Sequence, residues 1–448
     1  MASTYRKPGV YIQEIPNPAV AGLPAGFRLP GLVATGKTVL PVKNTATTKG
    51  ASNGADAITV GTYTISTVTS VGDVPDLAQY EEGVDWRQAG SNVQWISGGS
   101  QPTTGATYYV SWTRAKAAND YLPVMYTNMK DVRDNYGNEL DAGVPCAIPI
   151  AAKLMFDNGA PSIVIAQATT GSNSDLQTAV DTMKNQDIDI LIVPQSTNTT
   201  LTNYVRAHVL TQSAPSLAHE RIAITSADGF SDATTTIVNK ATTAFSERLW
   251  LIAPPSFTYT LKDATYQQDQ DVFLPSTYLA AAYAGTATNP SFDAASPLTR
   301  RSLVGPKNLS TFNYLESDKD YLGQAGVAVI ETGPGGFRIR HAVTTDNTNV
   351  NTVTASVILI KDHIRKTLRP LLDKQYIGTK ITAGTPSAVA TTVTTYLEQK
   401  ITDQIIVDYR NVSVVQDAAD PRTINIKFDI KPVYPLEFCD VSFSLVTA

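Results

Sequence analysis

The sequence contains little cysteine, histidine or charge. Its 448 residues include two cysteines and four histidines. Cys146 and Cys439 lie far apart, so we expect two reduced, half-buried thiols rather than a disulfide framework or a metal site. No pair of histidines has the spacing of metal ligands on a helix. The sequence therefore predicts no metal centre and no cofactor.

Charged residues make up 17% of the chain, and the formal net charge is -5. A nucleic-acid-binding protein needs clustered Lys and Arg to neutralise phosphates, so direct contact with nucleic acid is not expected. No apolar run approaches the length of a membrane span, and residues 1–10 lack the apolar core of a signal peptide. We therefore expect no membrane insertion, and folding in a reducing cytoplasm. A surface with so few charges suits lateral contact with other protein.

Strand patterns are present at both ends of the sequence. Residues 9–15 form an extended apolar-polar run, GVYIQEI, between two prolines, and residues 424–430 and 441–445 alternate apolar with polar side chains. Chain ends fray unless something ties them down, so we predict that these strands find backbone partners in another copy. The candidate intersubunit strand residues are Val10, Tyr11, Ile12, Gln13, Ile15, Ile424, Ile426, Phe428, Ile430, Val441, Phe443 and Leu445.

The middle of the chain changes pattern twice. Between about Leu40 and Arg114, β-type runs such as 93–96 and 108–112 alternate with Gly, Asn, Ser and Pro turns, which indicates a small inserted all-β module. From about Tyr121, short apolar runs alternate with segments of helical spacing. Strands buried on both faces read as continuous apolar runs, and parallel pairing requires crossover helices. This part therefore predicts a doubly wound sheet.

The last third of the chain is predicted to be α+β. A helical apolar period runs from Val353 to Leu372, ended by Arg369-Pro370, and strands close the chain. The fold expected overall is α/β, mixed α+β, with a doubly wound core, an inserted small all-β domain and extended strand arms at both ends. The predicted segments are an N-terminal arm and hinge (1–30), a β-rich outer domain (31–120), an α/β core (121–325) and a C-terminal α+β domain ending in a donated strand (326–448).

Two other functions compete at this point. Residues 31–38, GLVATGKT, match the phosphate loop of P-loop NTPases, in which Lys37 would reach the terminal phosphate and Thr38 would hold magnesium. That mechanism needs a strand before the loop and a helix after it, and Val39-Leu40-Pro41 begins no helix. A receptor-binding or adhesive surface protein that uses the β-rich segment is the other alternative. Asp187 and Asp189 are expected to face water, and we assign no catalytic residues.

Four stretches, taken in their order along the chain, resemble the tail sheath proteins of contractile bacteriophage tails and related injection machines. They are PGVYIQEI (8–15), LPS with the small-residue helix and ASP step that follow it (274–297), ILIKDHIR (358–365) and IKPVYPLE (430–437). The chain departs from the family pattern where Lys361-Asp362 replaces a doubly basic pair, and near Thr286, where an acidic-aromatic step is missing.

The resemblance implies a non-enzymatic structural subunit. In that family the N-terminal arm and the C-terminal strand add to a sheet in neighbouring subunits, and so link stacked hexameric rings around an inner tube. Contraction then drives the tube through the host envelope. The implied partners are further copies of the chain, the tail tube protein, and the baseplate and tail terminator proteins. The implied location is the virion tail, assembled in the host cytoplasm, and the β-rich segment resembles a variable outer domain of some sheath proteins.

Overall fold

The computed structural model describes residues 28–61, 63–310 and 314–444. Its centre is a nine-stranded sheet whose six inner strands run parallel, with antiparallel strands at both ends. In spatial order the strands are β17 (Ser302–Leu303), β20 (Gly336–Ile339), β19 (Val327–Gly333), β14 (Leu249–Ala253), β13 (Ile222–Ser226), β12 (Ile190–Ile192), β1 (Pro30–Thr35), β11 (Ile163–Ala168) and β8 (Val124–Tyr126).

Helices cover both faces of this sheet, because successive strand residues point to opposite sides and both sides are apolar. Leu32 packs with one core, beneath α2 (Ala147–Asp157) and α6 (Ser276–Thr288). Its neighbour Val33 packs with another, beneath α3 (Asn173–Thr182) and α4 (Thr199–Gln212). The helices α5 (Thr234–Thr243) and α7 (Glu316–Gln324) cover the same second face further along. The predicted α/β class is confirmed.

Strand β1 lies inside the sheet, between β11 and β12. Leu32, Val33 and Ala34 are fully buried there. The predicted boundary of the β-rich segment at residue 31 is therefore wrong, since residues 31–35 belong to the core sheet. An apolar run that is buried on both faces gains more from a central position than from a small surface module.

The helix α6 is buried along its whole length. Its backbone lies so close to α2 that a Cβ on Gly285 would stand 2.4 Å from the Met155 carbonyl oxygen. A helix that is apolar all round belongs in the interior of a protein, and the glycine permits this close contact.

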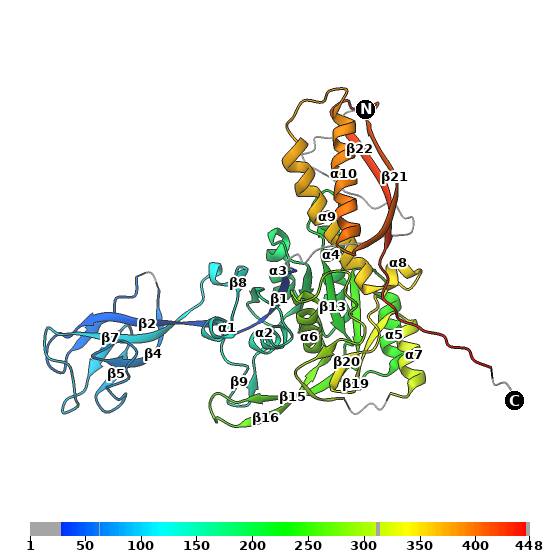
Figure 1. Ribbon diagram of the computed structural model, residues 1–448. Helices are drawn as coiled ribbons and strands as arrows, with labels where there is room; N and C mark the ends of the chain where they lie inside the picture. Colours follow the sequence, from blue (N-terminus) through cyan, green and yellow to red (C-terminus); the bar gives the residue numbers. More distant parts are fainter. Residues whose placement is uncertain (1–27, 62, 311–313, 445–448) are drawn as a thin grey trace.

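The β-rich segment forms a separate apolar cluster around Trp86, Trp95 and Trp112. Two three-stranded antiparallel sheets surround it, β2-β7-β4 and β3-β6-β5. Figure 1 shows this module standing away from the sheet at the left, with β2 and β7 leading toward the core. Its strands are β2 (Val39–Thr48), β3 (Ala55–Ala57), β4 (Ile65–Gly72), β5 (Trp86–Ala89), β6 (Asn92–Trp95) and β7 (Thr107–Ala115).

Smaller elements complete the core. The strands β16, β15 and β18 form a three-stranded antiparallel sheet, and β9 pairs with β10. These elements are η1 (Ala118–Tyr121), α1 (Met129–Tyr136), β9 (Leu140–Asp141), β10 (Val144–Pro145), η2 (Met183–Asn185), β15 (Ser256–Lys262), β16 (Asp269–Pro275) and β18 (Pro306–Leu309).

The C-terminal elements rise from one end of the core (Figure 1). They are α8 (Val350–Val353), α9 (Ala355–Tyr376), α10 (Thr385–Thr402), β21 (Ile406–Gln416) and β22 (Ile424–Pro432). The strand β22 pairs antiparallel with β21. The prediction that the strand at 424–430 lacks a partner in its own chain is therefore wrong, because β21 provides one a short turn earlier.

Residues 433–444 follow β22 without regular secondary structure. The alternating run predicted as a strand at 441–445 is not a strand in the single chain, as far as it is described. Val10, Tyr11, Ile12, Gln13, Ile15 and Leu445 lie outside the described residues.

Candidate assembly interface

The β21–β22 hairpin is a two-stranded sheet that lies along α10 (Figure 1). In β22, Ile424, Ile426, Phe428 and Ile430 are half-buried against the main apolar core. In strand β21 a bulge changes which alternate residues face the core, from Tyr409 before it to Val412 and Val414 after it. Within this bulge Asn411 has a φ of 56°. The extra residue at such a bulge bends the strand and shifts the side chains beyond it to the other face.

Each strand of this hairpin has one neighbour in the described chain. Its outer edge therefore presents backbone N–H and C=O groups without a strand to receive them. Such edges are templates for pairing with another chain, and monomeric proteins usually blunt or cover them. With β21 covering 11 residues and β22 covering 9, the hairpin offers two long edges of this kind.

The segment after the hairpin carries exposed apolar side chains. Leu436 is 87% exposed, Phe438 75%, Val441 79% and Phe443 84%. Figure 1 shows this segment, in red, running away from the body of the protein. Single exposed apolar residues are ordinary, but a concentrated run of them on an extended backbone indicates a binding segment that is covered in an assembly.

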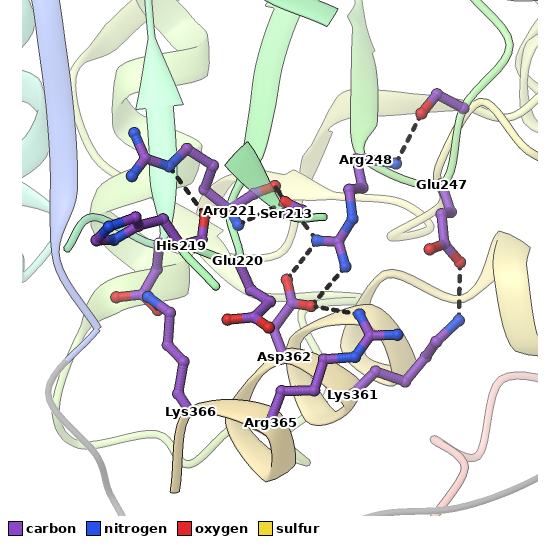
Figure 2. A network of polar contacts seen from close by, with 12 residues as sticks. Ser213, His219, Glu220, Arg221, Glu247, Arg248, Lys361, Asp362, Arg365 and Lys366 are labelled. Atoms are coloured by element: carbon purple, nitrogen blue, oxygen red, sulfur yellow. Dashed lines mark hydrogen bonds and ion pairs between the residues drawn. The ribbon is translucent and has the colours of Figure 1, made fainter. Parts of the chain in front are cut away.

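An ionic network joins the C-terminal elements to the core, and Figure 2 shows it from close by. The helix α9 presents one charged face to the amino ends of β12, β13 and β14. Its ion pairs are Lys361 with Glu247 (2.7 Å), Asp362 with Arg248 (2.7 Å for each of two bonds), Lys366 with Asp187 (2.7 Å) and Asp189 (2.9 Å), and Arg369 with Glu220.

The Asp362–Arg248 pair is the most buried part of this network. Burial alone would raise the pKa of Asp362, but the charge of Arg248 and the hydrogen bonds it donates outweigh burial, with help from Arg365 and Lys366. The pKa of Asp362 therefore lies below its ordinary value. Burial would likewise lower the pKa of Lys366, but Asp189 and Asp187 hold it above its ordinary value. Both groups are charged at neutral pH.

This network corrects the expectation that Asp187 and Asp189 face water. Asp187 is largely exposed, but both carboxylates bind the Lys366 ammonium. The pattern that could have indicated this is the spacing on α9, where positions 361, 362, 365, 366 and 369 fall on one helical face. Their partners come from three loops far away in the sequence, so the pattern alone could not identify them.

The phosphate-loop motif at 31–38 is not a phosphate loop in this fold. Residues 31–35 are strand β1, and the next element is another strand, β2, instead of a helix. A Cβ at Gly31 would stand 2.5 Å from the Ile188 side chain, so this glycine permits packing and does not cradle an anion. The Lys37 ammonium lies 3.1 Å from Asp141. The geometry required for an NTPase is therefore absent from residues 31–38.

Within 28–61, 63–310 and 314–444, no group of three or more His, Cys, Asp or Glu side chains could hold a metal ion. Within these ranges no helix has both the length and the hydropathy needed to cross a bilayer.

Comparisons with known proteins identify relatives of this chain. Residues 348–445 match the phage tail sheath C-terminal domain. The tail sheath protein of Mycobacterium phage Bxz1 is 29% identical over 340 residues, which are 73% of this chain and 56% of that protein. The chain therefore spans little more than half the length of this curated relative.

Two contracted sheath assemblies have similar folds. The helical sheath of the anti-feeding prophage superposes with a TM-score of 0.61 at 14% identity, over 98% of this chain and 99% of the other. The sheath of an extracellular contractile injection system, PVC, superposes with a TM-score of 0.58 at 11% identity, over 99% and 98%. At such low identity these likenesses show the fold.

Proposed function

We propose that this chain, a relative of the tail sheath proteins of contractile phage tails and related injection systems, is the structural subunit of a contractile sheath. The observation that carries the proposal is that one subunit has both a hairpin sheet with open edges and an exposed apolar tail. Each feature is a liability for an isolated protein and each is the complement of the other. Together with the sheath family match at 348–445, they support polymerisation.

In the proposed assembly, neighbouring copies add strands to the β21–β22 hairpin. The C-terminal arm would contribute Val441, Phe443 and Leu445, and the N-terminal arm would contribute residues 10–15. Main-chain hydrogen bonds would supply strength, and alternate side chains would supply register. Each net hydrogen bond is worth about 1 kcal/mol, and burying Val441 or Phe443 adds roughly 1.5–3 kcal/mol each.

The ionic network on α9 supports the proposal that the core and the C-terminal elements form one rigid body, whereas the arms move. Since Asp362 and Arg248 are buried together, separating the C-terminal elements from the core would leave a charge unpaired. We therefore expect each subunit to move as one body during contraction, with the arms absorbing the change. The stored energy would reside in the difference between two packings of these bodies, and no fuel would be consumed.

The remaining assignments follow from the family and belong to this proposal. The subunits would form stacked hexameric rings around a tail tube protein, ended by baseplate and tail terminator proteins. The protein would lie in the virion tail after assembly in the host cytoplasm, with the β-rich module outermost. We propose no enzymatic role and no cofactor, and neither an NTPase nor an adhesive function draws support from the relatives found.

Imaging of the purified full-length protein tests the proposal. Striated hollow cylinders are expected in negative stain at high protein concentration. A variant lacking residues 2–20 is expected to fold and to remain as single particles, since it lacks one of the two arms. Wild-type protein that stays as isolated particles under all conditions, or normal cylinders from the truncated variant, would contradict the proposal.

A further inference from the structure

The C-terminal tail is held to the body of the protein at two points before it becomes free. The first is Tyr434, whose hydroxyl donates a hydrogen bond to the side-chain oxygen of Asn351 in α8. The second is Glu437. Its Oε1 accepts a hydrogen bond from Thr299 Oγ1 at 3.2 Å, and its Oε2 lies 2.9 Å from His341 Nε2. Two segments far apart in the sequence thus hold one carboxylate.

The Thr299 hydroxyl beside Glu437 is oriented by a second hydrogen bond. The Thr299 oxygen accepts the backbone N–H of Ala342 at 3.1 Å, which leaves the hydroxyl proton free to point at Glu437. An ionised carboxylate only accepts hydrogen bonds, so a proton on His341 Nε2 would complete the second hydrogen bond to Glu437. The Glu437 side chain is mostly buried. Hydrogen bonds to a charged group in such a site are stronger than those between neutral groups.

The environment changes abruptly after this point. The ring of Phe438 still contacts His341 edge to face, with centroids 5.9 Å apart. Every described residue from 438 to 444 is exposed, whereas exposed and half-buried residues alternate from 433 to 437: Val433, Pro435 and Glu437 are half-buried, and Tyr434 and Leu436 are exposed. Glu437 therefore marks the boundary between the part of the tail that belongs to the body and the part that leaves it.

We propose that Glu437 is a positioning residue that fixes where the C-terminal arm leaves its subunit. Residues 433–437 stay with the donor, and the exchanged arm begins at Phe438, a few residues before the strand expected from Val441 onward. This inference rests on the proposed function, because it gives the arm a neighbouring copy to reach. A fixed starting point matters because a one-residue slip in an added strand would turn every apolar side chain to the wrong face.

Releasing the anchor would lengthen the arm. Residues 435–437 would join it and add about 10 Å of reach, because Tyr434 would still be held by Asn351. A longer flexible connection lowers the effective concentration of the strand at its docking site. Loss of Glu437 should therefore weaken assembly without removing any residue of the strand that docks.

A spin label on Cys439 tests the anchor in the full-length, unassembled protein. Cys439 is exposed and lies two residues after Glu437. Cys146 is replaced by Ser, which is a good N-cap for α2. Glu437→Ala is expected to raise the population of mobile label about tenfold. Glu437→Gln, which can still hydrogen-bond Thr299 and His341, is expected to restore most of the restriction.

Asp440→Ala is the matched control, since it removes the same charge on the exposed side of the boundary. An unchanged spectrum in Glu437→Ala, or equal mobility in Asp440→Ala, would overturn the anchor. In assembly, Glu437→Ala is expected to need a severalfold higher protein concentration than Asp440→Ala to form cylinders. A mobile label with normal assembly would overturn the positioning role alone. Failure of the wild type to assemble would instead overturn the proposed function, and the label would still report on the anchor.

Discussion

The core sheet and the C-terminal hairpin differ in how far one chain completes them. The core strand β14 has all five residues buried and a parallel neighbour on each edge, β13 and β19. The hairpin strand β22 is half-buried and has one neighbour, β21. The core therefore folds without help from another copy, and the hairpin leaves two edges that a neighbouring chain can complete.

This difference separates stability from assembly. Changes in the core or at the junction with α9 should act on the free energy of unfolding, whereas changes in the tail should act on polymerisation and leave the melting temperature alone. The two kinds of effect can be measured independently, in the isolated subunit and in the cylinder.

The largest effect is expected from removing residues 438–448. Cylinder formation should be lost completely, because the exposed apolar segment would be gone, while the melting temperature of the subunit should change little. Sedimentation velocity and thermal unfolding measure the two. A variant that lacks only residues 446–448 is the control and should assemble. A large fall in melting temperature in the longer deletion would show that the tail stabilises its own subunit.

The next largest effect is expected at the junction of α9 with the core. Asp362→Ala leaves the Arg248 guanidinium buried without its main partner and should cost about 3–5 kcal/mol of unfolding free energy. Chemical denaturation measures it. Asp373→Ala removes an exposed carboxylate from the same helix and should cost less than about 0.5 kcal/mol. Equal effects of the two variants would refute the rigid junction.

Acid should weaken the same junction. The pKa of Asp362 is lower in the folded protein than its ordinary value, so the pair contributes stability that is fully present above about pH 4. That contribution is lost as the pH falls through the lower folded value. Unfolding free energies measured from pH 6 to pH 3 should fall more steeply for wild type than for Asp362→Ala. Parallel curves would show that Asp362 does not govern the acid response.

A smaller loss is expected where α6 meets α2. Gly285→Ala would press a methyl group against the Met155 carbonyl and should cost about 1–3 kcal/mol. Gly323→Ala in α7, where a Cβ meets nothing within 4 Å, is the matched control and should be neutral or stabilising by up to about 1 kcal/mol. Both variants should still form cylinders. Loss of assembly in Gly285→Ala without loss of stability would contradict the separation of core and hairpin.

The smallest effect is expected at Lys37. This residue makes a partly exposed ion pair with Asp141, so Lys37→Ala should change stability by less than about 1 kcal/mol. Excess ATP and magnesium should leave the melting curves of wild type and variant unchanged, because residues 31–35 are a strand. A rise in melting temperature with nucleotide that is lost in Lys37→Ala would restore the NTPase reading.

The sequence predicted best those elements whose environment is uniform. The runs that became β11, β13 and β14 are mostly apolar because both faces are covered, with Gln167, Thr225 and Ser226 as the exceptions, and that pattern is visible without the fold. The strand β1 was not predicted, because residues 31–38 match the phosphate-loop motif and the boundary of the β-rich segment was placed at residue 31. Gly31 is there because the side chain of Ile188 occupies the space a Cβ would need, and Ile188 lies far along the chain.

The candidate interface was predicted only in part. The helix α9 was expected to end at Arg369-Pro370, but it continues to Tyr376. Leu372 is buried, and Arg369 pairs with Glu220, so tertiary contacts outweigh the backbone hydrogen bond that the proline cannot make. The substitution of Lys361-Asp362 for a doubly basic pair was visible in the sequence, but its meaning depends on Arg248 and Glu247, which only the fold brings to α9.

A high-resolution reconstruction of the assembled protein tests the central claim most directly. We predict that the edges of the β21–β22 hairpin carry added strands, formed by residues 10–15 and by residues from 441 onward of neighbouring copies, with continuous backbone hydrogen bonds between chains. A reconstruction in which both segments pack on their own subunit, with no backbone pairing between copies, would contradict the account.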